Sequence, residues 1–119
     1  MKAKDALGRR GETLAAEYLT ASGFRVVERN WRCPVGEIDI VAYEGSTLVI
    51  VEVKTRTTDA FGHPFEAITP AKLRRLHLLS AAWAEAREAG WQRELRVDVV
   101  GILCPESGPP VIQHLRAVQ

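Results

Sequence analysis

Two strongly apolar segments joined by a short turn constrain the fold of this 119-residue chain more than any other feature. The segments are EIDIVAYE, residues 37–44, and TLVIVEVKTR, residues 47–56, with Gly45 and Ser46 between them. Runs rich in β-branched residues on either side of a two-residue turn predict a β-hairpin. The run LVIVEV is so nearly apolar throughout that it is typical of a central strand covered on both faces.

Four charged residues interrupt these apolar strands, although charged side chains are seldom buried without partners. They are Glu37, Asp39, Glu52 and Lys54. Because side chains alternate between the two faces of a strand, the two acids of the first strand should share one face, while Ile38 and Ile40 share the other. The same rule places the two charges of the second strand together on one face.

The turn decides which of these charges lie opposite each other across the hairpin. A two-residue turn at residues 45–46 places Asp39 opposite Glu52. The same turn places Glu37 opposite Lys54. A turn one residue earlier places Glu37 opposite Glu52 instead and keeps all four charges on one face, whereas a three-residue turn separates them. We expect the turn at residues 45–46, because it matches the composition of tight hairpin turns.

Two explanations account for charges in such a hairpin. Opposed carboxylates with Cβ atoms about 4.5–5.5 Å apart repel each other unless a cation lies between them. Asp and Glu oxygens suit Mg²⁺, and Lys54 adds a positive charge beside them. The alternative is an edge hairpin with one solvated face, whose charges form ordinary cross-strand salt bridges. The near-continuous apolar run favours a buried functional site over the solvated edge.

The flanking segments predict two helices. The first spans residues 6–22, with Asp5 as its N-cap and Gly23 at its end. Glu12 borders its apolar stripe, and Gly8 should allow this helix to approach the sheet closely. The second helix begins after Thr69 as N-cap, and a C-cap is expected at Gly90.

Three further strands complete the predicted fold. They span residues 24–31, 94–104 and 110–118. The order of elements is then α-β-β-β-α-β-β, which predicts an α/β sandwich with a mixed central sheet and flanking helices. The length suits one domain, residues 1–119.

Composition excludes several classes of protein. No apolar run is long enough to span a membrane, and the N-terminus lacks the apolar core of a signal peptide, so we expect a cytoplasmic protein. Cys33 and Cys104 have the spacing of neither a zinc motif nor a disulfide framework. A net charge of +1 gives no global sign of nucleic-acid binding, although basic residues cluster near both helix starts.

Several stretches resemble a known family. GEIDIVA followed by VEVKTR resembles the D…(D/E)-x-K signature of the PD-(D/E)XK nuclease superfamily. Together with GRRGETLAAEYLTASGF, RNWRC and FGHPFEAI, they resemble the YraN-like family, whose uncharacterised members are classed as endonucleases. This family is similar to archaeal Holliday-junction resolvases. The proline of the superfamily name has no equivalent here, because Ile38 precedes Asp39.

The resemblance implies a restriction-endonuclease-like fold and a metal-dependent endonuclease that acts on DNA, including structured or branched DNA. Asp39 and Glu52 would bind Mg²⁺ or Mn²⁺, and Lys54 would position or activate the attacking water. Glu12 would complete the catalytic set. The resolvase similarity also favours a homodimer. The alternative is a non-catalytic nucleic-acid-binding or scaffolding protein on the same fold.

Other residues are candidates for accessory roles or nucleic-acid contacts. Trp31 lies between two arginines, which favours it over the other tryptophans as a partner for bases. His77 and His114 are expected to be structural. Asp98 could pair with Arg96 or a helix cap, or it could border the site, and the structural role is favoured. The candidate accessory residues are Arg9, Trp31, Arg32, Glu37, Arg56, His63 and Lys72.

Overall fold

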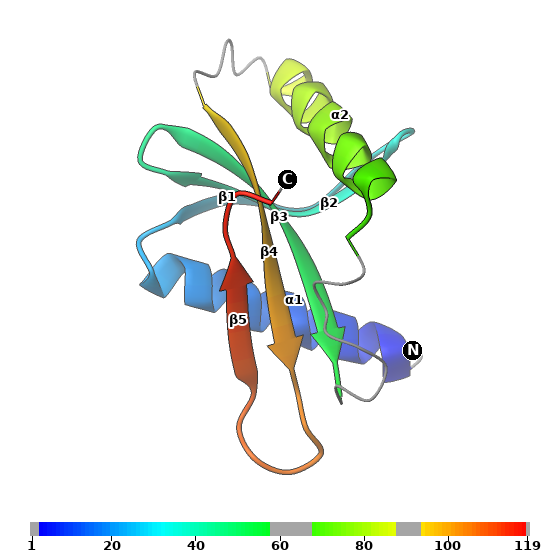
Figure 1. The fold of residues 1–119 in the computed structure, drawn as a ribbon, viewed down its shortest axis with the longest axis vertical. Helices are drawn as coiled ribbons and strands as arrows, with labels where there is room; N and C mark the ends of the chain where they lie inside the picture. Colours follow the sequence, from blue (N-terminus) through cyan, green and yellow to red (C-terminus); the bar gives the residue numbers. More distant parts are fainter. Residues whose placement is uncertain (1–2, 58–67, 88–93, 119) are drawn as a thin grey trace.

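The computed structural model describes residues 3–57, 68–87 and 94–118, and it contains two helices and five strands in these ranges (Figure 1). The elements are α1 (Ala3–Ala21), β1 (Arg25–Cys33), β2 (Gly36–Glu44), β3 (Thr47–Arg56), α2 (Pro70–Ala86), β4 (Leu95–Leu103) and β5 (Val111–Leu115). The predicted order α-β-β-β-α-β-β is confirmed. None of the helices within these ranges is both long enough and apolar enough to cross a bilayer.

Gly23 ends α1 as predicted. Its φ of 97° lies in the left-handed region that glycine adopts without steric cost. The backbone N–H of Phe24 donates to the carbonyl of Leu19 at 2.9 Å, and the N–H of Gly23 donates to that of Thr20 at 3.1 Å. These two bonds form a Schellman motif, which satisfies the last carbonyls of the helix. The predicted N-cap is wrong, because α1 begins at Ala3 and Asp5 is already helical.

Thr69 caps α2 as predicted. Its Oγ1 accepts a hydrogen bond from the backbone N–H of Lys72 at 3.1 Å, and Pro70 occupies the first helical position, where no N–H is needed. The helix ends earlier than expected, at Ala86 with Arg87 as its C-cap. Gly90, the predicted C-cap, lies outside the described residues.

The five strands form one sheet in the order β1-β2-β3-β4-β5. Strands β3 and β4 are parallel, because α2 connects them, and the other neighbouring pairs are antiparallel. The sheet is therefore mixed, as predicted. Strand β3 is its central strand, which rules out the alternative of an edge hairpin.

The helices cover opposite faces of this sheet (Figure 1). Helix α1 packs on the face that carries Val49 and Val51, and α2 packs on the face that carries Leu48 and Ile50. This alternation along one strand produces two cores, one under each helix. A sandwich of this kind explains why β3 is apolar on both faces.

Strand β2 departs from simple alternation near Asp39. Ile40 packs in the core under α1, whereas Ile38 packs in the core under α2. The expectation that these isoleucines share a face is therefore wrong. On the neighbouring strand β1, Asn30 has a φ of 54° and lies between the residues paired with Ile38 and Ile40. Both strands are thus irregular at the level of Asp39, which reorients the side chains beyond it.

Candidate functional site

The sheet opens between β2 and β3 at the middle of β3. The two strands pair from Glu44 opposite Thr47 as far as Ile40 opposite Val51, with a two-residue turn at Gly45 and Ser46. This is the predicted register. Beyond Ile40, β2 pairs only with β1, and β3 continues beside β4 as far as Arg56. The strands therefore diverge, as the ribbon shows (Figure 1).

Asp39 lies at the point of divergence. Its Oδ2 accepts a hydrogen bond from the backbone N–H of Val53 at 2.8 Å. A side-chain carboxylate therefore satisfies a backbone donor on β3 where the ladder with β2 has ended. The predicted direct opposition of Asp39 with Glu52 is replaced by this arrangement.

Glu37 is also displaced from the partner that the register predicted. It pairs with Arg32 on β1, and its Oε2 lies 3.0 Å from Nε of Arg32. Both side chains are exposed. The expected opposition of Glu37 and Lys54 is wrong, because β2 has left β3 before reaching Glu37.

Glu52 is buried and accepts contacts from two lysines. Its Oε1 lies 3.1 Å from Nζ of Lys54 on the same strand and 3.0 Å from Nζ of Lys72 on α2. Lys54 reaches Glu52 because residues two apart on a strand share a face. Lys72 reaches it from the first turn of the helix that covers this face. The structure therefore brings together Glu52 and Lys54, two predicted catalytic residues, and makes Lys72, a predicted accessory residue, a direct partner of Glu52.

Burial perturbs the pKa values of the charged groups at this opening. Burial, with the nearby Glu52 carboxylate as a second cause, raises the pKa of Asp39 to about 7. Burial also lowers the pKa of Lys54, and the adjacent Lys72 ammonium adds to that effect. An acid and a lysine whose pKa values both shift toward neutrality are typical of sites where a proton or a cation is exchanged.

Glu12 belongs to the same electrostatic cluster. Burial raises its pKa, and Glu37 and Glu52 add to this shift, whereas Arg29 and a hydrogen bond with the Asn30 side chain oppose it. Glu12 in turn contributes to the raised pKa of Asp39. Among the described residues, Oε1 of Glu12 is a buried oxygen without a hydrogen-bond partner. A carboxylate oxygen in that position can accept a cation or a donor from a ligand.

Gly11 allows α1 to approach the sheet closely enough to place Glu12 there. A Cβ at residue 11 would lie 1.9 Å from Oγ1 of Thr55 on β3, whereas a Cβ at Gly8 would meet no atom within 4 Å. The predicted role of Gly8 in close approach is therefore wrong, and Gly11 fills it. A second contact holds α1 against β1, where Nη2 of Arg29 donates a hydrogen bond to Oγ1 of Thr13 at 3.1 Å.

A cavity of about 250 Å³ lies on the α2 side of the opening. Asp39 and Glu52 contribute carboxylates to its wall, Lys72 and Arg75 contribute positive charge, and Leu79 lines the apolar side. This volume is large enough for several water molecules or a small charged group. With Glu37, which also lines it, the cavity places three carboxylates and two cationic side chains around a space open to a ligand.

The donor set has the chemistry of a site for one hard divalent cation. Mg²⁺ is usually held by one or two carboxylates together with water and substrate oxygens. Asp39 and Glu52 supply that number, and the buried oxygen of Glu12 lies in the same cluster. Within residues 3–57, 68–87 and 94–118, no three His, Cys, Asp or Glu side chains form a preassembled metal cage.

The remaining candidate contacts lie in different environments. Arg9 is exposed on α1, and Arg56 is half-buried at the end of β3. Trp31 is half-buried and packs against the core under α2, so part of its ring already has a protein partner. His63 lies outside the described residues.

Two residues of the site were missed in the sequence. Arg75 lines the cavity beside Lys72, and only its place in a basic cluster pointed to it. Asn30 bends β1 beside Asp39. Asparagine is rare inside strands and tolerates the left-handed conformation, so a strand asparagine was the available signal.

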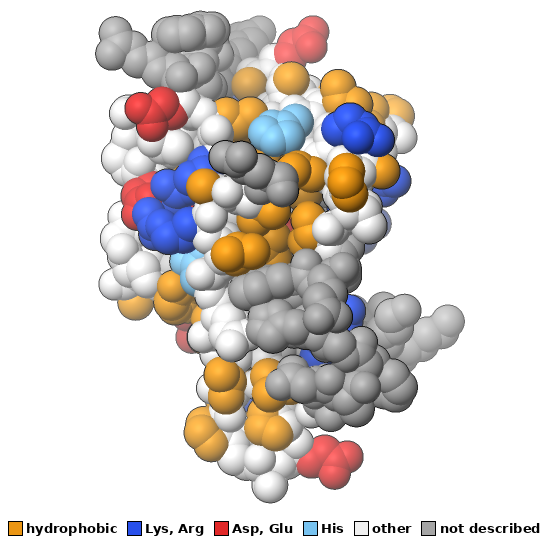
Figure 2. All heavy atoms as spheres, in the orientation of Figure 1, with side chains coloured by type: hydrophobic (Ala, Val, Ile, Leu, Met, Phe, Trp, Pro, Cys, Tyr) orange, Lys and Arg blue, Asp and Glu red, His pale blue; other side chains and the backbone are white. Residues whose placement is uncertain are grey.

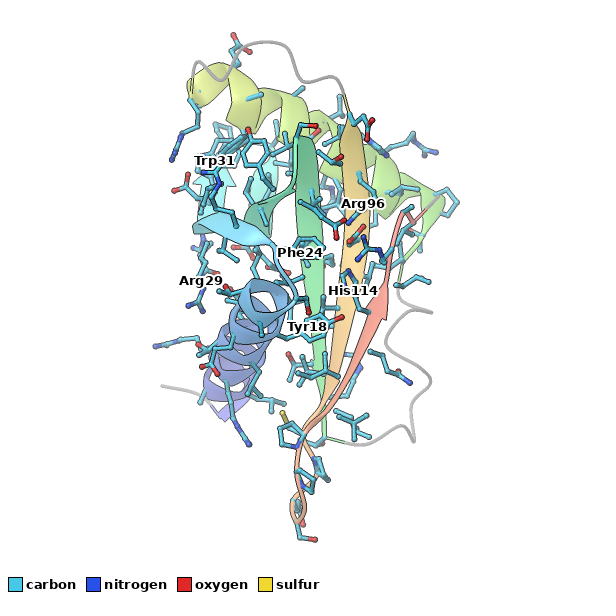
Figure 3. The ribbon with its side chains drawn as sticks, turned by 90° about the vertical axis from the view of Figure 1, so that its left-hand side faces the viewer. Tyr18, Phe24, Arg29, Trp31, Arg96 and His114 are labelled. Atoms are coloured by element: carbon cyan, nitrogen blue, oxygen red, sulfur yellow. The ribbon has the colours of Figure 1, made fainter. Side chains whose placement is uncertain are left out.

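A second buried polar cluster lies away from this opening, between α1, β4 and β5 (Figure 3). The hydroxyl of Tyr18 lies 2.9 Å from Nδ1 of His114, whose Nε2 lies 2.8 Å from Oδ2 of Asp98. Arg96 donates to both oxygens of Asp98 at 2.8 and 2.9 Å. The expected structural pairing of Asp98 with Arg96 is confirmed. Each of these groups has partners within the protein, which fits a structural role.

Two hollows on the face shown in Figure 2 are predominantly apolar. They measure about 330 and 440 Å³ and share Leu73, His77 and Val118 in their walls. No carboxylate is among the described residues that line them. They therefore lack the acid–lysine chemistry found at the opening between β2 and β3.

Comparison with known proteins places this chain in a family. The model of uncharacterised protein family UPF0102 matches residues 11–102, which include Glu12, Asp39, Glu52, Lys54 and Lys72. A UPF0102 protein of Arthrobacter sp. (strain FB24) is 58% identical over 118 residues, which cover 99% of each chain. One from Streptomyces coelicolor is 50% identical over 119 residues, which cover 99% of this chain and 92% of the relative. The YraN-like resemblance is thereby confirmed at the level of the family, and the chain belongs to the uncharacterised protein family UPF0102.

Proposed function

We propose that this protein is a metal-dependent endonuclease that hydrolyses phosphodiester bonds in DNA, with structured or branched DNA among its candidate substrates. In this proposal the sheet and its two helices form a restriction-endonuclease-like sandwich. The observation that carries the proposal is the opening between β2 and β3. It gathers Asp39, Glu52 and Lys54 beside a cavity, and Glu12 belongs to the same electrostatic cluster.

Asp39 and Glu52 would hold the Mg²⁺ or Mn²⁺ ion. Such an ion stabilises negative charge on phosphoryl oxygens and makes a nearby water more acidic. The raised pKa of Asp39 fits this role, because burial and then the nearby Glu52 carboxylate disfavour its charge, and a bound cation would favour it. The buried oxygen of Glu12 belongs to the same electrostatic cluster, beside the two carboxylates that would hold the ion.

The protein's own side chains would position the reactants. In the reaction, a water oxygen forms a bond to phosphorus and the bond from phosphorus to one ester oxygen breaks. The water loses one proton, and the leaving oxygen gains one. Lys54 would orient the attacking water or neutralise the phosphorus-centred charge in the transition state. Burial lowers the pKa of Lys54, which makes its ammonium a better proton donor than an exposed lysine.

One observation favours the alternative of a non-catalytic nucleic-acid-binding or scaffolding protein. Both lysines contact the same oxygen of Glu52, so this carboxylate already has counter-ions within the protein. A scaffold on the same fold could retain such a cluster for stability alone. The two functions differ in whether a divalent cation enters the cluster and whether DNA is cut.

A cleavage panel tests the proposal directly. The protein is incubated with single-stranded, duplex, flap and four-way-junction DNA in Mg²⁺ or Mn²⁺, and Asp39→Asn serves as the matched control. We expect cleavage of at least one of these substrates by the wild type and none by the variant, and the panel shows whether branched DNA is preferred. Absence of cleavage on every substrate, with intact DNA binding, would favour the scaffold.

Lys54→Ala separates catalysis from binding. If Lys54 acts in the chemical step, this variant should lose single-turnover cleavage by about 100-fold or more while largely keeping DNA affinity in Ca²⁺. A scaffold would instead lose one phosphate contact, which lowers the salt dependence of binding by about one unit. Single-turnover cleavage and salt-titrated binding of both proteins distinguish these outcomes.

A further inference from the structure

Lys72 occupies a position where helix electrostatics disfavour a lysine. It is the third residue after the N-cap Thr69, and no acidic residue lies in this first turn. In a capping box this position carries Glu or Gln, and a cation here opposes the positive end of the helix dipole. Because a lysine at this partly buried helix position is electrostatically unfavourable, we expect its side chain to make a stabilising or functional contact with another element.

The compensating partner of Lys72 is Glu52. Nζ of Lys72 lies 3.0 Å from the same Oε1 that Nζ of Lys54 approaches at 3.1 Å. Lys54 is held beside Glu52 by the strand that carries them both. Lys72 comes from another element and duplicates that ion pair, so one of the two lysines is available for a different partner.

Lys72 is the lysine better placed to leave. Its side chain is 29% exposed, against 17% for Lys54, and it lines the cavity. Its backbone is fixed, because its N–H donates to Oγ1 of Thr69. A flexible side chain on a fixed backbone can exchange partners without moving the helix.

We propose that Lys72 is a displaceable counter-ion, which neutralises Glu52 before a divalent cation binds and then turns to a phosphate of the DNA. The inference rests on the proposed function and adds an order of events to it. In the cation-free cluster, Lys54 and Lys72 supply two positive charges beside the carboxylates of Asp39, Glu52 and Glu12. Entry of a divalent cation leaves an excess of positive charge, which attracts a phosphodiester to the cavity.

Opposite effects on two affinities test this role. Manganese binding is measured by calorimetry on the wild type, Lys72→Met and Arg74→Met, without DNA. Arg74 is exposed on the same helix and has the same charge, so it controls for long-range electrostatics. Removal of the competing ammonium should tighten Mn²⁺ binding by about fivefold, and the Arg74 variant should change it less.

Binding to four-way-junction DNA in Ca²⁺ supplies the second measurement. Lys72→Met should weaken it by about fivefold and lower the salt slope by about one unit, whereas Lys72→Arg should largely retain DNA affinity. A purely structural lysine would instead lower the melting temperature and weaken both affinities together. That result would overturn the inference.

Two further results would also overturn it, and they have different meanings. If Lys72→Met binds Mn²⁺ no more tightly than Arg74→Met does, Lys72 is no competitor of the cation, and the proposed nuclease site is unaffected. If Asp39→Asn binds Mn²⁺ as tightly as the wild type does, Asp39 is not a ligand and the ion does not bind at the proposed site. The proposed function and this inference would then both fail.

Discussion

The carboxylate of Asp39 makes a stabilising hydrogen bond, but its negative charge is unfavourable where it lies. Its Oδ2 accepts from the backbone of Val53, and this bond secures the end of the β2–β3 ladder. Its charge lies near Glu52 in a buried setting, which raises its pKa to about 7. The charge therefore destabilises the fold without a cation, although the proposed metal site requires it. Such a conflict is common where function sets the residue type.

Asp39→Asn should stabilise the protein in EDTA. An amide oxygen can still accept from Val53, while the repulsion disappears. We expect about 1–3 kcal/mol of added unfolding free energy at pH 8. Because the folded pKa of Asp39 is raised, the wild type recovers this stability as protons bind between pH 7 and 4, so the advantage should fade over that range. Urea unfolding from pH 4 to 8 measures it, and a constant difference would contradict the assignment.

The sequence predicted which residues form the site better than it predicted how they meet. Alternation and the two-residue turn correctly gave the register from Glu44 to Ile40. They could not show where the ladder ends, because that depends on Asp39 binding a backbone N–H of β3 and on the bend at Asn30. These are tertiary effects of single residues, and strand periodicity does not encode them.

At the scale of elements, the close packing of α1 on β3 depends on one glycine. Gly11 lies against Thr55 so closely that a Cβ would come within 2.9 Å of the Cβ of Thr55 as well as within 1.9 Å of its Oγ1. Glu12 is the next residue, so any displacement of α1 at this point also moves its carboxylate. Helix position and site geometry are therefore coupled.

Gly11→Ala should destabilise the fold by about 2 kcal/mol, because the added methyl group overpacks the contact with β3. It should also reduce the proposed cleavage by about tenfold or more by moving Glu12. Gly8→Ala is the matched control: its Cβ meets nothing, so better helix propensity should stabilise by about 0.5–1 kcal/mol. Chemical unfolding and cleavage rates test both variants, and equal effects would refute the coupling.

The same pair of glycines shows the limit of sequence reasoning about elements. Gly11 lies within the apolar stripe of α1 and Gly8 lies at its margin, but the stripe does not show how closely either glycine approaches the sheet. The choice between them depends on the tilt of α1 across the sheet, which packing with β3 determines. By contrast, the helix ends marked by Gly23 and Thr69 were predictable, because the caps act through local hydrogen bonds.

At the scale of the whole molecule, the opening in the sheet receives one helix from each face. Helix α1 brings Glu12 toward the opening from one side, and α2 brings Lys72 from the other. Neither helix is close to the other in sequence. The site therefore depends on the sheet holding both helices in place, and its geometry should be sensitive to loss of global stability.

A buried network joins several elements away from the site. Asp98 on β4 accepts hydrogen bonds from Arg96 and from the backbone N–H of Ala117. It also contacts one ring nitrogen of His114 on β5, and the other ring nitrogen contacts the hydroxyl of Tyr18 on α1. Arg96 also lies 2.8 Å from Glu44 at the end of β2. The network thus links α1, the central hairpin and the C-terminal strand. It stabilises the arrangement of elements and contributes no group to the proposed chemistry.

Asp98→Asn should therefore lower stability without changing the site. Burial by itself would raise the pKa of Asp98, but hydrogen bonds from His114, Arg96 and Ala117 outweigh it and hold the pKa at about 2. A folded pKa below the unfolded value gives stability that is present above about pH 4 and is lost as the pH falls toward 2.

We expect Asp98→Asn to reduce the unfolding free energy by about 2 kcal/mol at pH 7, and the difference from the wild type to shrink below pH 4. Calorimetric Mn²⁺ affinity at a temperature where both proteins are folded should be unchanged, because Asp98 lies in a separate cluster from Asp39 and Glu52. Loss of Mn²⁺ affinity in the folded variant would show that the network also determines the geometry of the opening. The Asp39→Asn and Asp98→Asn pair should thus have opposite effects on stability, since one carboxylate lacks a counter-charge and the other is fully paired.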